Sequence, residues 1–222
     1  DREAGEGAIL SGASADGTFG ALLALNCATD FVAKNADFIG VAQTLLDMAI
    51  ADKLTSKDDL LAKNYPGATI TVAEKIIEEV GKIGERIEIG TYETIEAPHV
   101  AAYIHPGNRL ATVVGFSANV ADAGRDVAMQ AAAMAPVALN EDQIPADLIE
   151  KERELGKDLA IQEGKPAEMA EKIAEGRLKK WFKEVTLVNQ AFIKDNKSTV
   201  AQYVAAAATG AEITGFRRAA LD

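Results

Sequence analysis

The sequence has few of the residues that enzymes use for covalent or metal-based chemistry. It contains one cysteine, Cys27, and two histidines, His99 and His105, among 222 residues. A single cysteine cannot form an intrachain disulfide, and no group of histidines and cysteines is available to bind zinc. The Gly-x-Ser-x-Gly motif of a nucleophile elbow is also missing. We therefore predict that the protein is not an enzyme and that it has no cofactor, catalytic residue or metal site.

Glycines at 12 and 17 look superficially like part of a phosphate-binding loop. The lysine of such a loop is missing, however, and a strand is predicted after the glycines, where a phosphate-binding loop would lead into a helix. We interpret both glycines as part of a hairpin.

Basic residues are fewer than acidic ones, 23 against 34, which gives a net charge of −11. This balance argues against direct binding to nucleic acid or to an anionic membrane. No run of 18 apolar residues exists, so no membrane span is expected. The first residues do not form a signal peptide, and they look like sequence from the middle of a chain, so we expect a cytoplasmic location. The acidity suits a partner with basic patches or simply provides solubility, and both interpretations stay open.

Aromatic residues make up 5% of a chain that is 48% hydrophobic, so cores of alanine, leucine, isoleucine and valine are expected. Two stretches, residues 8–26 and 100–118, each contain two apolar runs around Asp16-Gly17 or Pro106-Gly107. This pattern is typical of β-hairpins, and the offset between the copies is 90 residues. An amphipathic helix is predicted after each hairpin.

The offset falls to 86 residues at those helices, so the first copy carries four extra residues between hairpin and helix. The segment concerned is residues 27–35, and an insertion confined to one copy is a candidate functional loop. Further helices are predicted from the capping signals at Ser56 and at Thr71-x-x-Glu74. Strands are predicted over residues 87–95, 184–188 and 213–216, with a helix over 200–208.

The fold class expected from these patterns is α+β, with two related subdomains of antiparallel strands and packed helices. We place the first at residues 1–96 and the second at 97–222. The second contains a predicted coiled-coil-like helical hairpin at 146–183. A stripe with two polar members, at the alternating spacing of four and three residues, precedes the break at Gly164-Lys-Pro166 and suits such a projecting hairpin. Its members are Leu148, Glu152, Leu155, Leu159 and Gln162.

Three blocks of the sequence resemble the elongation factor Ts family. They are Asn26-Cys-Ala-Thr-Asp-Phe-Val-Ala33, Gly164-Lys-Pro-Ala-Glu-Met-Ala-Glu-Lys-Ile-Ala-Glu-Gly-Arg177 with its continuation to Phe192, and Ile213-Thr-Gly-Phe-Arg217. They span nearly the whole chain in the order of the family. The resemblance implies a guanine-nucleotide exchange factor that releases GDP from the translational GTPase elongation factor Tu. It also implies a small N-terminal helical domain with a Thr-Gly-x-Gly motif, which is absent from this sequence, so affinity for the GTPase is expected to be weakened.

The resemblance also assigns site residues. Thr29, Asp30, Phe31 and Val32 match the segment that enters the GTPase near its magnesium and phosphate site, and His105 matches a histidine that contacts its nucleotide-binding domain. The residues themselves allow a plainer interpretation, in which Thr29 or Asp30 caps a helix and Phe31 packs on the core. A protein that uses the same core as a structural or chaperone-like scaffold is the alternative function. An exchange factor needs Phe31 to be exposed, a scaffold tolerates its burial, and an enzyme needs a concave polar pocket. The sequence does not determine the oligomeric state.

Overall fold

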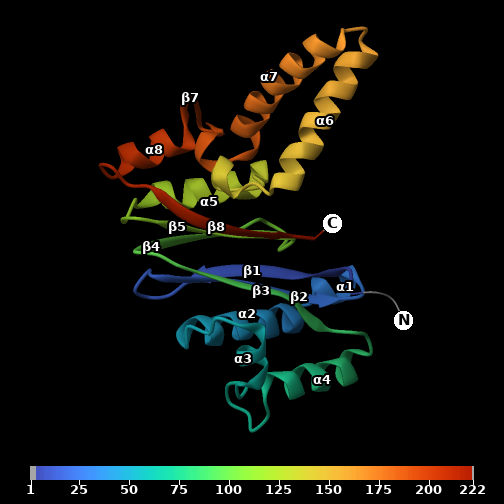
Figure 1. The fold of residues 1–222 in the computed structure, drawn as a ribbon. Coiled ribbons are helices and arrows are strands. Elements are labelled where there is room, and N and C mark those ends of the chain that lie inside the picture. Colours follow the sequence, from blue (N-terminus) through green and yellow to red (C-terminus); the bar gives the residue numbers. More distant parts are fainter. Residues whose placement is uncertain (1–3, 222) are drawn as a thin grey trace.

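Two three-stranded antiparallel sheets form the body of the protein, in a computed structural model that describes residues 4–221 (Figure 1). The strand order is β1-β2-β3 in the first sheet and β4-β5-β8 in the second, and β6 pairs with β7 in a small separate sheet. The bounds are β1 Glu6–Ala13, β2 Phe19–Cys27, β3 Glu88–Glu96, β4 His99–Ile104, β5 Leu110–Phe116, β6 Ala191–Phe192, β7 Asp195–Thr199 and β8 Ile213–Ala220. The antiparallel pairing agrees with the α+β class expected from the sequence.

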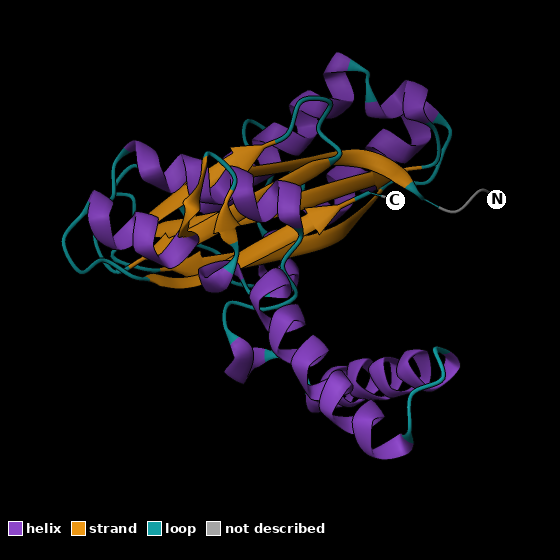
Figure 2. Ribbon diagram, turned by 90° about the horizontal axis from the view of Figure 1, so that it is seen from above, coloured by secondary structure: helices purple, strands orange, loops and turns teal. Residues whose placement is uncertain are grey.

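The two sheets pack face to face, with helices on their outer faces. Ile9 and Leu22 of the first sheet form an apolar cluster with Ala111 of the second. Beside it, Ser11 Oγ donates a hydrogen bond of 3.0 Å to the carbonyl oxygen of Tyr103 on β4. The view from above in Figure 2 shows strands of the two sheets running in similar directions, as expected for an aligned sandwich.

The helices come in groups between the strands along the chain. Their bounds are α1 Asp30–Ala33, α2 Ala36–Ala51, α3 Lys57–Ala62, α4 Val72–Ile83, α5 Asp122–Met134, α6 Ala146–Gln162, α7 Ala167–Val185 and α8 Val200–Ala207, with 3₁₀ turns η1 Glu141–Gln143 and η2 Leu187–Asn189. In Figure 1, α2 lies against the outer face of the first sheet with α3 and α4 beyond it, and α5 lies against that of the second with α8 beyond it.

The helices begin where the capping residues predict. Thr71 accepts a hydrogen bond from the backbone of Glu74, whose side chain accepts one from Thr71 in return, and α4 starts at the next residue. Ser56 caps α3 through one hydrogen bond, which its hydroxyl accepts from Asp59 N at 3.1 Å. The predicted hairpin turns are also found, because Gly17 and Gly107 adopt positive φ angles of 74° and 95° that favour glycine.

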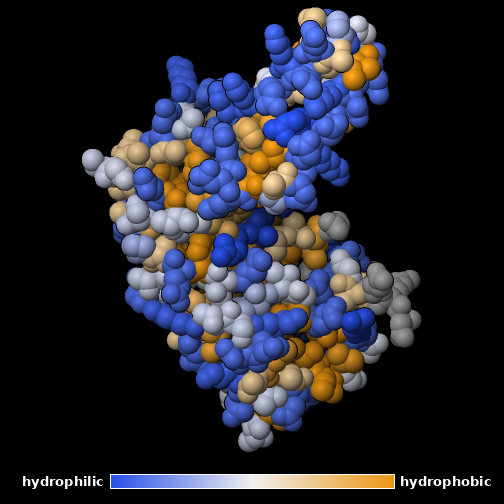
Figure 3. Space-filling view, in the orientation of Figure 1, coloured by the Kyte–Doolittle hydropathy of each residue, from blue (hydrophilic) through white to orange (hydrophobic). Residues whose placement is uncertain are grey.

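Helices α6 and α7 project from the body as an antiparallel pair (Figure 1). Hydrophilic residues cover most of the pair, with some apolar ones near its far end (Figure 3). The stripe predicted along α6 is only partly buried, because Leu148 and Leu159 are half-buried but Leu155 is 48% exposed. The fully buried residues of α6 are Gly156 and Ala160. Small residues line the contact instead: a Cβ added at Gly156 would lie 3.3 Å from Cα of Ala174 on α7. Coiled-coil packing of this pair stays a prediction.

The predicted strand over residues 184–188 is wrong as well. Helix α7 continues to Val185, and the 3₁₀ turn η2 follows at once. Thr186 Oγ1 donates to the carbonyl oxygen of Phe182 at 2.6 Å, which satisfies one of the last carbonyls of the helix. The valines and leucine of this segment, which favour a strand by propensity, are therefore overruled by the packing of Leu187 in the core.

Candidate functional site

The insertion found in the first copy of the repeat folds as a single helical turn between two caps. Thr29 has an extended backbone and its hydroxyl accepts a hydrogen bond from Val32 N at 3.4 Å, so it is the N-cap of α1. Asn35 then caps α2, accepting from Asp37 N at 2.9 Å and from Phe38 N at 3.3 Å. A turn held at both ends presents its middle residues in a fixed orientation.

Phe31 points away from the body, so the core position allowed by its sequence is wrong. Its exposed fraction is 84%, the largest among the exposed large hydrophobic residues of the described chain. Val32 and Ala33, by contrast, are partly buried against the hydrophobic core between the first sheet and its helices. Asp30 is exposed beside Phe31 and lies 3.8 Å from the Lys34 ammonium. One face of the turn is thus anchored, and the other presents an aromatic ring next to a carboxylate.

Glu85 holds the turn in place, and the sequence analysis did not find it. Its carboxylate accepts hydrogen bonds from the backbone amides of Ala28 at 3.0 Å and Thr29 at 3.1 Å, and from the Thr29 hydroxyl at 3.1 Å. Gly84, in the left-handed conformation at the end of α4, sets the direction of the chain that leads into Glu85. No local sequence pattern predicts this role, because the carboxylate and the turn that it holds are 56 residues apart in the sequence.

Cys27 is the last residue of β2 and comes just before the turn. It is fully buried, as predicted for a small apolar residue, and its thiol donates to the carbonyl oxygen of Thr29 at 3.2 Å. Burial, together with the negative charge of Glu85, raises the pKa of the Cys27 thiol to about 11. The thiol is therefore a structural group and not a nucleophile.

His105 lies at the turn between β4 and β5 and is exposed. Its Nδ1 lies 3.0 Å from the hydroxyl of Tyr103, whose ring is buried. The turn is closed by a hydrogen bond from His105 N to the carbonyl oxygen of Leu110 at 2.8 Å. His105 is thus held in one orientation at the surface.

The two predicted site segments lie at the same end of the sheet sandwich. The carbonyl oxygen of Asn108, in the His105 turn, accepts from Ile9 N on β1 at 2.8 Å, and Arg109 pairs with Glu6 at the start of β1. Glu6 lies opposite Cys27 in the β1–β2 register, and Cys27 comes two residues before the Thr29 cap. Residues 29–32 and His105 therefore flank the same strand ends.

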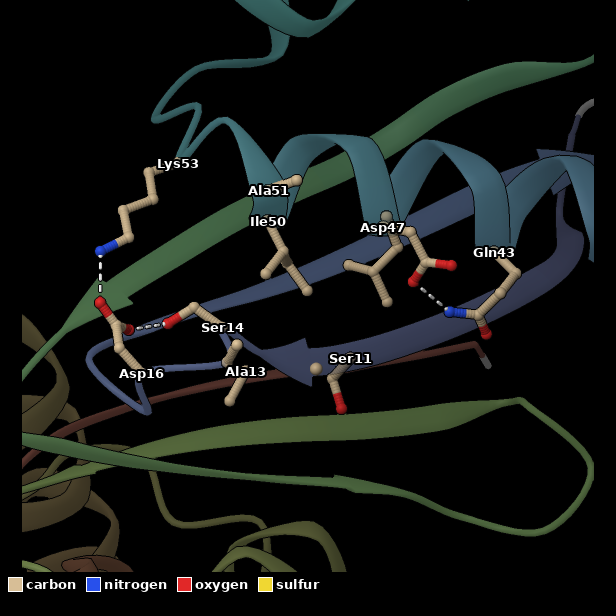
Figure 4. A pocket seen from close by; sticks show the side chains of 12 residues that line it. Ser11, Ala13, Ser14, Asp16, Gln43, Asp47, Ile50, Ala51 and Lys53 are labelled. Carbon is tan, nitrogen blue, oxygen red and sulfur yellow. Dashed lines mark hydrogen bonds and ion pairs between the residues drawn. The ribbon is translucent and has the colours of Figure 1, made fainter. Parts of the chain in front are cut away.

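A groove lined partly by polar side chains lies between β1 and α2 (Figure 4). Its polar residues satisfy one another: Asp16 accepts from the Ser14 hydroxyl at 2.5 Å and pairs with Lys53 at 2.9 Å. These hydrogen bonds and the Lys53 charge lower the pKa of Asp16 far below its usual range. Asp16 also accepts from Thr18 N, as expected for a residue that stabilises the hairpin turn. The Asp16 carboxylate is therefore engaged in holding the hairpin turn together, and its lowered pKa makes it a poor base for the Ser14 hydroxyl.

Over residues 4–221, no group of three or more histidine, cysteine or acidic side chains is placed to hold a metal ion. Within the same residues, no helix has both the length and the apolar character needed to cross a membrane.

Comparison with known proteins places these features in one family. The family described as Elongation factor TS matches residues 28–222. Elongation factor Ts of Christiangramia forsetii is 47% identical over 224 aligned residues, which cover 100% of this chain and 80% of that protein. Elongation factor Ts of Porphyromonas gingivalis is 43% identical over 100% of this chain and 80% of its own length. That of Ralstonia nicotianae is 41% identical over 95% of this chain and 70% of its own length.

Proposed function

The chain belongs to the elongation factor Ts family of translation elongation factors, and we propose that it promotes the release of GDP from the GTPase elongation factor Tu. The observation that carries this proposal is the exposure of Phe31 at 84% on a turn fixed by two caps and by Glu85. An aromatic ring in solvent gains nothing for the free protein, but it can fill a pocket on a partner.

Exchange requires no bond to be made or broken. A factor that binds the nucleotide-free GTPase more tightly than the GDP-bound form weakens GDP binding by the same ratio, because the two equilibria are linked. Typical couplings of this kind change affinity by about 5- to 150-fold. Residues that distort the partner are therefore sufficient, and no catalytic group is needed.

Phe31 and Asp30 are the residues we propose for this distortion. A rigid ring that enters the GTPase beside its nucleotide site displaces the side chains around it. A carboxylate beside that ring disturbs the charges that hold magnesium and diphosphate. Thr29 and Val32 keep the pair in position, the first as a cap and the second as an anchor in the core.

His105 extends the proposed surface to the second subdomain. Its fixed orientation on Tyr103 and its place at the same end of the sandwich support a contact with the nucleotide-binding domain of the GTPase. We also propose that the two subdomains meet at residue 97, because the last strand of the first sheet, β3, ends at Glu96 and the first strand of the second sheet, β4, begins at His99. A cytoplasmic location follows from a role in translation.

A scaffold without exchange activity is the rival proposal, and it gives no reason for an exposed Phe31. The test is the release of a fluorescent GDP from elongation factor Tu, followed by stopped flow after excess unlabelled GDP is added. We expect release to accelerate with the concentration of this chain until it saturates. Unchanged release at a concentration where gel filtration shows a complex would support the scaffold and contradict exchange.

A further inference from the structure

A second surface lies at the base of α7, on the outer side of the second subdomain. It is a groove of about 440 Å³ between the last turns of α7, the strand β7 and the end of α5. Lys180 and Lys183 of α7 line one side, Lys197 of β7 lines the other, and Met134 of α5 lies between these elements. Its volume is within the range of about 300–1,000 Å³ that is common for ligand-binding sites.

The groove is basic although the protein is acidic. None of its three lysine ammonium groups forms an ion pair with a carboxylate of residues 4–221. Nearby Lys194, which does not line the groove, is paired with Asp126. Glu184 is the one acidic residue of the lining, so lysines outnumber carboxylates there in a chain whose net charge is −11. Unpaired charges gathered around a hollow favour an anionic partner.

The surface at the groove is also apolar. Met134 and Val137 are each 47% exposed, and Val137 is held close to α7 by a hydrogen bond of 2.8 Å from its amide to the carbonyl oxygen of Val185. Exposed apolar side chains beside unpaired lysines are typical of a site that recognises a partner with both acidic and apolar residues.

We propose that this groove binds an acidic peptide segment of a partner protein, with an apolar side chain seated on Met134 and carboxylates on Lys180, Lys183 and Lys197. Single-stranded nucleic acid fits less well, because no aromatic residue lines the groove to stack on bases. The proposed exchange surface consists of residues 29–32 and His105, and none of these residues lines the groove, so the site is separate from that surface.

The test is fluorescence anisotropy with a labelled peptide of sequence EDLFEDLE. We expect a Kd of about 10–100 µM that weakens as salt rises, because charges supply part of the affinity. A peptide with serines in place of its apolar residues, EDSSEDSE, should bind at least about tenfold more weakly, which corresponds to about 1.4 kcal/mol.

Two double charge reversals on the same helix provide a matched comparison. Lys180→Glu with Lys183→Glu should weaken binding of EDLFEDLE at least about tenfold. Lys172→Glu with Lys179→Glu changes the net charge equally, but neither residue lines the groove, so its effect should be much smaller. Circular dichroism melts should be alike for both variants. Equal weakening by the two variants, or tighter binding of an oligonucleotide of the same charge than of the peptide, would overturn the proposal.

Discussion

The Glu85 carboxylate accepts hydrogen bonds from both the backbone amide and the hydroxyl of Thr29, although the two residues are 56 positions apart in the sequence. This contact ties the end of α4 to the turn that carries Phe31. We expect Glu85→Ala to leave the fold intact and to lower the rate of GDP release from elongation factor Tu, because the turn becomes free to move.

The stability cost of Glu85→Ala should be about 1–3 kcal/mol, since hydrogen bonds to a charged group are lost from partly buried donors. Glu88→Ala is the control, because Glu88 pairs with Arg86 at the surface and does not contact the turn. Urea unfolding and fluorescent-GDP release measure the two effects. Normal release by Glu85→Ala would show that the fixed position of the turn is unimportant.

The contact between Tyr103 and His105 leads to a second prediction about exchange. His105→Ala should slow GDP release less than a change at Phe31 does, because the role we propose for His105 is to support binding and not to distort the partner. The fold should be unaffected, since His105 is exposed. Isothermal titration calorimetry with elongation factor Tu should show weaker binding. If affinity and release are both unchanged, His105 has no place on the partner surface.

The seam of the helical pair can be tested through stability. Gly156→Val should lower the free energy of unfolding by about 1–3 kcal/mol, because the added side chain has no room beside Ala174 and valine is a poor helix former. Leu155→Val is the matched control on the same helix, and it should cost under about 1 kcal/mol because Leu155 is 48% exposed. Urea denaturation compares them. A larger loss at Leu155 would mean that the apolar stripe expected from the sequence is the true seam.

The Cys27 thiol gives a pH-dependent prediction. Its pKa in the folded protein is about 11 against an ordinary value near 9.0. The unfolded thiol therefore ionises first as the pH rises, so the contribution of Cys27 to stability is complete below pH 9 and is lost between pH 9 and about 11. The melting temperature should fall over this pH interval, and the melting temperature of Cys27→Ala should fall less steeply.

Reactivity checks the same group independently. Iodoacetamide should not label Cys27 at pH 8 in the native protein and should label it fully in urea, because the thiol is buried and protonated when folded. Rapid labelling of the native protein would contradict this assignment.

Local sequence signals predicted much of the fold. The capping box at Thr71, the turns at Gly17 and Gly107 and the amphipathic helix after the first hairpin each depend on neighbours within a few residues, and the structure contains all of them. The family resemblance that the sequence supports is confirmed by the comparisons.

The sequence did not predict features that depend on contacts between residues far apart in the chain. Small residues such as Gly156 carry little hydrophobic signal, yet they form the seam because they allow the helices to approach closely. The segment around Leu187 has the composition of a strand, but it forms a 3₁₀ turn in which Leu187 is buried in the core. Glu85 belongs to this group, since its role exists only after the chain that follows α4 has met the turn that follows β2. Sequence and resemblance pointed to Phe31, but only the fold gives its exposure.

The central claim is that Phe31 acts in the complex and not in the folding of the free protein. The most direct measurement compares Phe31→Ala with the unchanged chain in a thermal melt and in fluorescent-GDP release from elongation factor Tu. Because Phe31 is 84% exposed, stability should change by less than about 0.5 kcal/mol, while release at equal concentration should slow at least about tenfold. A loss of about 3–5 kcal/mol would show that Phe31 belongs to the core. Unchanged melting together with unchanged release would contradict the proposed exchange mechanism.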